Sequence, residues 1–489
     1  MSSPDSCNAP CRGAIASPLS PFPELLASND MPNDVQAAAI SSAVEKAQAD
    51  LIFCPNSVEL QAFIQSHTAI LAPIRRVPNE ILAEFFAYCV DVSEPLDPKK
   101  GEAWVVSRVC CRWRAVAIAC PELWSHFVFP KEPIKHLQDS IHVQLERAPY
   151  PSPLSIRVQG AYEVPRDVMD LLFAAHARWE ELVLRNNRDL VKFVRRAHNT
   201  QFPRLKKLEI NDDLSSRLLD GQDPAATFDI VQSFPALTNL YVDARNELLP
   251  TQLDLPWSQL QHCTLWCFLT ADVLRILPLL PPCASVVIRA IHDADAPQAS
   301  QMAVSKVMIS TLEFDNCERR LTTTLLAVFR APSLRKFVFR HNHWSRAAAA
   351  PIEVANFLTR SGCALEHWRV EGAPLSDAGV LGILKRGHDT RWMNELIRLD
   401  VHRITDKLRE LLKALGRETG EGKVLVPNLR TLAVRGSSEL EGVDVLGLLK
   451  SRNPTLRRLP FERWQWEFPD SESGDGLEAR LDVVILEDD

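Results

Sequence analysis

One short apolar phrase recurs along the chain after residue 150, and it limits the folds that the chain can adopt. The phrase is an apolar residue, two residues of any kind, a second apolar residue, one further residue and a third apolar residue. Clear copies begin at residues 205, 237, 260, 283, 309, 334, 365, 396, 429 and 456, with less regular copies at 154 and 179. From residue 205 the starts lie 32, 23, 23, 26, 25, 31, 31, 33 and 27 residues apart. A recurrence of this length indicates a repeat protein.

Helical apolar patterns lie between the copies of the phrase. They fall at 189–197, 271–277, 321–329, 352–358, 378–384, 406–415 and 443–449. A short strand followed by a helix, repeated many times, gives a curved α/β solenoid with a parallel sheet on its concave face. The sequence therefore predicts an α/β fold, with a solenoid of divergent leucine-rich repeats at residues 131–466.

The segment at 73–124 carries a different pattern. It reads PIRRVPNEILAEFFAYCV from Pro73 and, after a loop at 91–101, WVVSRVCCRWRAVAIACPELW from Trp104. Both parts place apolar and aromatic residues at helical spacing. A bundle of two or three short helices is too small to bury all of this apolar surface internally, so we expect a partner helix to cover the remainder.

This segment resembles the F-box, particularly that of its large fungal family. The resemblance lies in Pro-Ile-Arg-Arg-x-Pro-x-Glu-Ile-Leu-x-x-Phe-Phe followed by Val-Cys-x-x-Trp-Arg-x-x-Ala-x-x-x-Pro-x-Leu-Trp, about fifty residues in all. Two positions depart mildly from the family pattern: Val77 stands where leucine is common, and Cys111 where a basic residue is common. F-box domains bind a Skp-type adaptor, which links them to a cullin, a RING subunit and a ubiquitin-conjugating enzyme.

The resemblance implies a substrate receptor of an SCF-type cullin-RING ubiquitin ligase, a non-catalytic subunit. It assigns adaptor contacts to eight positions: Pro78, Ile81, Leu82, Phe85, Val109, Cys110, Trp113 and Trp124. Some of these side chains could instead form the core of the bundle. For Trp113 the two roles are equally expected, whereas for Pro78 and Leu82 we favour the interface.

The remaining segments complete the predicted organisation. Residues 1–34 are rich in Ser, Pro, Ala and Asn, which predicts disorder. A helical lead-in at 35–71 is expected to pack on the F-box domain at 72–130, and a short coiled-coil dimerisation element is the alternative. Residues 467–489 carry nine acids and one base, which predicts a solvated acidic tail.

The expected target-binding surface is the concave face of the solenoid, because residues between the core positions of each phrase point outward. Aromatic residues beside arginines are typical of interface hot spots. We therefore expect a protein partner to dock here, with its acidic groups near the arginines. A neighbouring loop that covers Trp266 is the alternative for that residue. The positions are Tyr241, Trp266, Arg340, Arg369 and Arg435.

Several other functions are disfavoured by the sequence. The net charge is −7, and the acidic tail accounts for it, so the nearly neutral remainder predicts no nucleic-acid binding. No zinc-type cysteine spacing, phosphate-binding loop or nucleophile motif occurs, and His341 with His343 lacks a third ligand, so we expect no metal, no cofactor and no catalytic site.

The sequence also carries no secretion signal and no apolar run long enough for a membrane span. We therefore expect a cytoplasmic or nuclear protein. Two alternatives to a ubiquitin-ligase receptor remain: a scaffold or interaction protein without a ligase role, and an enzyme that merely uses a repeat-like fold.

Overall fold

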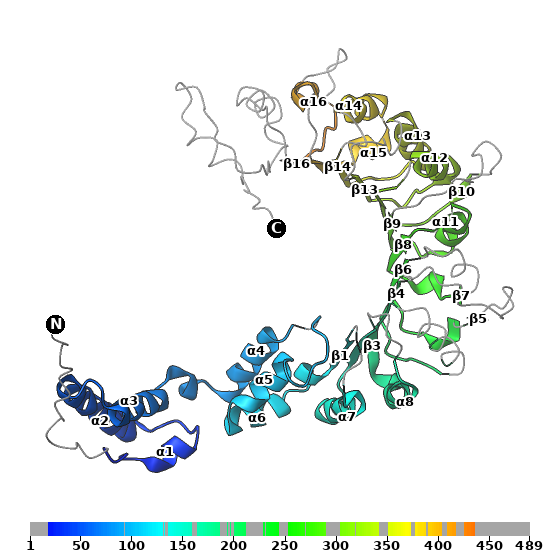
Figure 1. Ribbon diagram of the computed structural model, residues 1–489. Coiled ribbons are helices and arrows are strands. Elements are labelled where there is room, and N and C mark those ends of the chain that lie inside the picture. The colour runs from blue at the N-terminus through cyan, green and yellow to red at the C-terminus, as the bar shows by residue number, and fades with distance from the viewer. Residues whose placement is uncertain are drawn as a thin grey trace, which may run out of the picture. The chain divides into compact units, whose positions relative to one another are not determined.

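The copies of the recurring phrase form short strands in the computed structural model (Figure 1). The structure describes residues 18–435 apart from 92, 131, 133–134, 159–163, 186–192, 194–195, 197–199, 212–227, 230, 244–252, 269, 290–303, 318, 342–350, 373–376, 388–389, 403–407 and 417–424. The predicted copy at 456 and the predicted helix at 443–449 lie outside these residues, as does most of the predicted helix at 189–197.

The strands form one twelve-stranded sheet in the order β1-β2-β3-β4-β6-β8-β9-β11-β13-β14-β15-β16. From β3 to β16 every neighbouring pair is parallel. The twelve strands are β1 His126–Phe129, β2 Leu154–Val158, β3 Trp179–Leu184, β4 Lys207–Asn211, β6 Asn239–Asp243, β8 His262–Trp266, β9 Ser285–Arg289, β11 Thr311–Asp315, β13 Lys336–His341, β14 His367–Gly372, β15 Arg398–His402 and β16 Thr431–Arg435. Two further pairs form small parallel sheets: β5 Phe228–Asp229 with β7 Leu253–Asp254, and β10 Ser305–Lys306 with β12 Phe329–Arg330.

The chain divides into two compact units, Met1–Ser155 and Ile156–Asp489. In the second unit, helices follow the strands and lie on the outer side of the curved sheet, while the strands line its inner side (Figure 1). This confirms the predicted α/β solenoid of leucine-rich-repeat type. Its helices are α8 Arg166–Ala174, α11 Thr270–Ile276, α12 Arg319–Val328, α13 Pro351–Ser361, α14 Asp377–Arg386, α15 Arg391–Asn394 and α16 Leu408–Gly416.

The core of the solenoid is built from the apolar positions of the phrase. In β4 the side chains of Leu208 and Ile210 are buried, whereas those of the residues between them are partly exposed. Aromatic rings extend this core where a Phe-Pro pair precedes the phrase. Phe202 and Phe234 are fully buried with ring centroids 5.5 Å apart, and Phe202 also packs on Trp179 at 5.2 Å. Each repeat thus packs on the next, as a solenoid requires.

The first unit begins with a helical hairpin. Helices α2 Asp34–Phe53 and α3 Val58–Ile70 pack against each other and against the short helix α1 Pro23–Ala27. Residues 1–34 are predicted to be disordered, but helix α1 lies within them. Its Leu25 is buried against Ile40, Val44 and Ile70, and this packing holds α1 against the hairpin. The structure places the lead-in helices as a pair with its own core, and it leaves the coiled-coil alternative untested.

A second group of short helices follows the hairpin. It comprises η1 Pro73–Arg76, α4 Asn79–Cys89, α5 Glu102–Val109, α6 Cys111–Ile118, η2 Pro121–Trp124 and α7 Leu137–Arg147. The Phe86 and Trp113 rings lie 4.9 Å apart, and Trp104 meets Trp124 edge-on at 5.2 Å. The Arg147 guanidinium lies over both indoles, at 4.7 and 4.3 Å. Because α7 thus packs with these helices, the first compact unit extends to Ser155.

Arg112 on α6 ties this group of helices to the chain that enters α4. Its guanidinium donates hydrogen bonds to the Arg75 carbonyl at 2.8 Å, the Val77 carbonyl and the Asn79 side chain at 3.0 Å. Charge-assisted bonds of this kind are stronger than neutral ones, and their loss leaves two carbonyl groups without a donor.

We expect Arg112→Met to loosen the start of α4 by about 2 kcal/mol, because a methionine fills similar space without donors. The backbone amides of residues 73–82 should then exchange roughly 30-fold faster with deuterium, as measured by mass spectrometry. Arg114→Met, on the exposed side of the same helix, is the matched control. Equal exchange in the two variants would show that Arg112 has no such role.

Candidate functional site

Helix α4 presents a stripe of exposed apolar side chains. Ile81, Phe85 and Tyr88 follow one another at intervals of four and three residues, so they lie on one face of the helix, and all three are exposed. On α5, Val105 and Val109 form a second exposed pair at a spacing of four. Exposed aromatic and branched side chains in such number are typical of a surface that another protein covers.

The eight positions expected to contact an adaptor divide into a surface group and a buried group. Pro78, Ile81, Phe85 and Val109 are exposed, and Trp113 and Cys110 are partly buried. Leu82 and Trp124 are fully buried, as the alternative of a core role for some of these side chains would have it.

The buried and partly buried side chains among these positions have structural roles within the helices. Leu82 lies on the inner side of α4, one helical turn before Phe86, and the Trp124 indole donates to the Ala117 carbonyl at 2.8 Å. The Cys110 sulfur caps α6 by accepting from the Trp113 amide at 3.3 Å. These residues support the helices that carry the exposed stripe.

The concave face of the solenoid holds the aromatic pair predicted from the sequence. Tyr241 on β6 and Trp266 on β8 are partly buried, with perpendicular rings whose centroids are 6.2 Å apart. Burial, and after it the carboxylate of Asp243, raises the pKa of Tyr241 to about 12, so its hydroxyl stays neutral. Trp266 retains an exposed portion, so the residues that the structure describes do not cover it completely.

The arginines expected to receive acidic groups of a partner are already paired within the solenoid. Arg340 lies 3.3 Å from Glu313 and 3.5 Å from Glu371, on the two neighbouring strands. Arg369 also contacts Glu371, at 2.8 Å. Acidic groups of a partner near Arg340 and Arg369 would therefore meet arginines that already have acidic neighbours, and the Arg435 side chain lies outside the described part of the chain.

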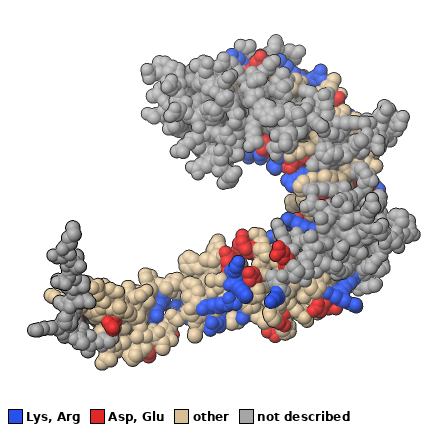
Figure 2. Space-filling model, in the orientation of Figure 1, with Lys and Arg blue, Asp and Glu red and all other residues tan. Residues whose placement is uncertain are grey.

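The same pairing continues along the sheet and was not predicted. Near its start, Glu181 on β3 receives Arg157 at 3.1 Å and Lys207 at 2.5 Å. Further along, Arg289 reaches Asp315 at 2.8 Å. Basic and acidic side chains accordingly lie next to one another on the surface in Figure 2. The sequence signal was present, since these residues occupy equivalent positions in neighbouring phrases, but the partners follow only from the strand register.

Asp400 on β15 is a deeply buried acid of this series. Its carboxylate is 1% exposed and accepts from His367 at 2.8 Å and Arg398 at 2.8 Å. Burial alone would raise the pKa of Asp400, but the hydrogen bonds from His367 and Arg398 outweigh it, so this pKa lies below its ordinary value. The carboxylate is therefore ionised, and it holds both basic side chains in place.

Comparison with protein-family models and with curated proteins returned no match to this chain. In the described part of the chain, no group of three or more His, Cys, Asp or Glu side chains meets as a metal site. His343 lies outside that part, and so does the side chain of His341. No helix among the described residues is long and apolar enough to cross a membrane.

Asp400 gives a pH dependence whose sign follows from its lowered pKa. The stabilisation is present above the ordinary aspartate pKa and is lost as the pH falls through the lower value of the folded state. We expect Asp400→Asn to reduce the free energy of unfolding by about 2–3 kcal/mol at pH 7 and to flatten its decline below about pH 4. Urea titrations at several pH values, followed by circular dichroism, measure both effects.

The matched control is Asp170→Asn, which removes the exposed partner of Arg196. An exposed ion pair contributes less than about 1 kcal/mol, so this variant should resemble the wild type. If Asp400→Asn and Asp170→Asn had the same effect, the buried cluster around Asp400 would have no special contribution.

Proposed function

We propose that this protein is the substrate receptor of an SCF-type ubiquitin ligase. The observation that carries the proposal is the exposed stripe of Ile81 and Phe85 on α4, which coincides with the sequence that resembles an F-box. The same chain continues into a leucine-rich-repeat-type solenoid, whose long inner face suits the capture of another protein. Together these features support one adaptor surface and one target surface on a single chain.

The adaptor would cover the exposed stripe. Ile81 is 47% and Phe85 is 53% exposed, while Leu82 and Phe86 anchor the other side of the same helix in the core. A helix of the adaptor that lies on α4 and α5 would bury the stripe together with Val109. Rigid aromatic and branched side chains lose little conformational entropy on binding, which suits them to serve as anchors.

The proposed mechanism is tethering rather than catalysis by this chain. The adaptor would connect the receptor to the cullin, the RING subunit and the charged ubiquitin-conjugating enzyme. A target held on the solenoid would then present its lysines to that enzyme at high effective concentration. Such a subunit needs two binding surfaces and no cofactor or catalytic residue of its own.

The target surface would centre on the aromatic pair of Tyr241 and Trp266, rather than on the arginines. Both rings keep exposed portions, and they pack against each other, so little rotamer freedom remains to be lost on binding. Arg340 and Arg369 are engaged by Glu313 and Glu371. A partner would therefore meet a charge-balanced surface around an aromatic centre.

The adaptor surface can be tested with two matched double variants. Ile81→Ala with Phe85→Ala removes the stripe, and Ile52→Ala with Phe53→Ala removes the same residue types from the tip of the hairpin, where they are 78% and 81% exposed. We expect the first variant to weaken binding of a Skp-type adaptor by about 2–4 kcal/mol, roughly 30- to 1,000-fold. The second should bind as the wild type does. Calorimetry with the purified adaptor gives the affinities.

Wild-type protein that does not bind the adaptor would overturn the proposed function. Equal losses in the two variants would overturn the assigned surface. Adaptor binding without co-purification of a cullin from cells would favour the scaffold alternative, in which the protein has no ligase role.

The target surface predicts a separate effect. We expect Tyr241→Ala with Trp266→Ala to lose the protein partners that the wild type recovers from cells, while adaptor binding stays unchanged. Affinity purification with mass spectrometry compares the two partner sets. The control is Tyr150→Phe with Phe53→Leu, because both side chains are exposed and lie in the other unit. An unchanged partner set for the first variant would move the site away from the concave face.

A further inference from the structure

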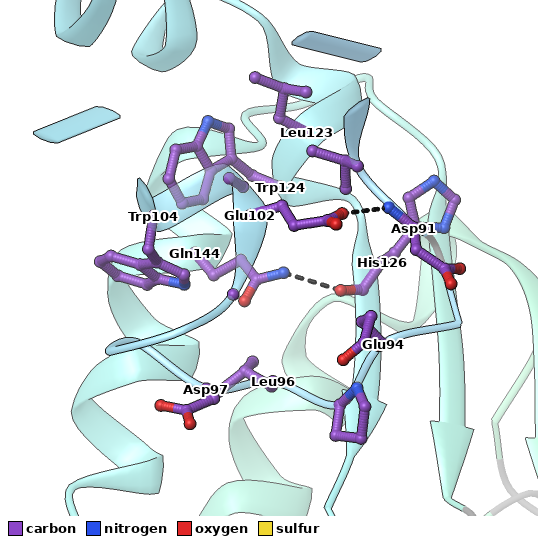
Figure 3. Close-up of a pocket in the computed structure, with 14 residues that line it drawn as sticks. Asp91, Glu94, Leu96, Asp97, Glu102, Trp104, Leu123, Trp124, His126 and Gln144 are labelled. Carbon is purple, nitrogen blue, oxygen red and sulfur yellow. Dashed lines mark hydrogen bonds between the residues drawn. The ribbon is translucent and has the colours of Figure 1, made fainter. Parts of the chain in front are cut away.

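A small cavity lies in the first unit beside the helices that carry the exposed stripe (Figure 3). Its volume is about 50 Å³, and its walls come from three places: the loop between α4 and α5, the start of α5, and the region from η2 to α7. Trp104, Trp124 and Leu123 form its apolar side. A cavity of this size admits the head of one polar side chain or a few water molecules.

The loop that forms one wall is held in a fixed position. The Leu96 amide donates to the Val128 carbonyl at 2.7 Å, which joins the loop to β1. The Arg108 guanidinium donates to the Pro98 carbonyl from the other side. The loop ends at Gly101. This position requires glycine, because a Cβ there would lie 2.8 Å from the Asp97 carbonyl oxygen. The cavity is therefore a preformed feature with several independent supports.

The cavity wall contains a buried acceptor without a donor. Gln144 on α7 is 5% exposed, and its Nε2 donates to the His126 carbonyl at 2.8 Å, which fixes the amide with Oε1 as the acceptor. Among the residues that the structure describes, no hydrogen-bond donor reaches that Oε1. Figure 3 shows the Gln144 side chain in the midst of the residues that line the cavity. Buried side-chain oxygens are nearly always satisfied, so this one calls for a donor.

The charged residues that line the cavity are all acidic: Asp91, Glu94, Asp97 and Glu102. Three of them already accept from the loop, since Asp91 binds the Ser93 amide, Asp97 the Lys99 amide and Glu102 the Asp91 amide. Glu94 is exposed, and its carboxylate accepts no hydrogen bond from the described part of the chain. The basic residues nearby, Lys99, Lys100, Arg108 and Arg147, do not line the cavity.

We infer that this cavity binds the guanidinium group of an arginine side chain from a protein partner. A guanidinium is a planar cation with five N–H donors and no acceptor, so it can serve the Gln144 oxygen and the Glu94 carboxylate at once. This site is separate from the exposed stripe on α4 and does not depend on the proposed function.

The test uses the full-length protein and two capped tripeptides. One is glycyl-arginyl-glycine, and the other carries citrulline in place of arginine, which keeps the shape but replaces one nitrogen by oxygen and removes the charge. We expect saturable binding of the arginine peptide by calorimetry, with a change in tryptophan fluorescence. The citrulline peptide should bind at least about tenfold more weakly, because it loses the charge and offers an acceptor to Glu94.

Two substitutions, each of which removes one negative charge, test whether the peptide binds in the cavity. Glu94→Gln should weaken the arginine peptide about tenfold and leave the citrulline peptide unaffected. Asp139→Asn, an exposed acid on α7 outside the cavity, should change neither. Absence of saturable binding, equal affinities for the two peptides, or equal effects of Glu94→Gln and Asp139→Asn would each overturn the inference.

Discussion

The parallel, in-register pairing of the strands is the constraint on which the rest of the solenoid depends. In each pair the same position of the phrase lies opposite its counterpart: Leu208 faces Leu240, which in turn faces Cys263. Hydrogen bonding therefore stacks the apolar positions into continuous buried rows and the positions between them into rows along the inner face. A slip of one residue would exchange the two sets, so the apolar phrase fixes the register and the register fixes the surface.

This coupling explains why charges of opposite sign lie opposite one another at several positions of the inner face. Like charges directly opposite one another in neighbouring strands destabilise a sheet, and opposite charges stabilise it. Glu181 faces Lys207, and Arg340 faces Glu371, so the rows are neutralised locally. Residues that a partner would touch thus also hold neighbouring strands together. Substitutions on this face affect folding and recognition at once, whereas the aromatic pair of Tyr241 and Trp266 is less involved in such ion pairs.

Much of the architecture could be predicted from periodicity alone. The phrase located the strands, and helical spacing located α11, α12, α13 and α14, because both patterns report which residues must be buried. The ion pairs could not be predicted, since the repeats differ in length and only the strand register shows which residues become neighbours. The residue that caps α3 could not be predicted either: Ser57 caps this helix by accepting from the Leu60 amide at 3.3 Å.

The adaptor positions show the same limit at the level of one helix. Ile81, Leu82, Phe85 and Phe86 fall on one broad apolar face, and the sequence does not say which half faces inward. Tertiary packing determines which half faces inward. Trp113 on α6 packs against Phe86, so Leu82 and Phe86 lie in the core. The resemblance named Leu82 as a contact, whereas its burial makes Ile81 and Phe85 the side chains available to a partner.

The two candidate surfaces differ in chemistry, and this difference bears on how the protein would work as a receptor. An apolar stripe such as that of Ile81 and Phe85 binds through burial of apolar area, which is little affected by salt. The inner face of the solenoid consists of paired charges around an aromatic centre, so a partner must replace or accommodate ion pairs such as Arg369 with Glu371. Mismatched charges there would cost several kcal/mol. The affinity of the apolar stripe for its partner would therefore change little with salt concentration. Selectivity among targets would arise on the inner face of the solenoid, where the strand register determines the positions of the charges.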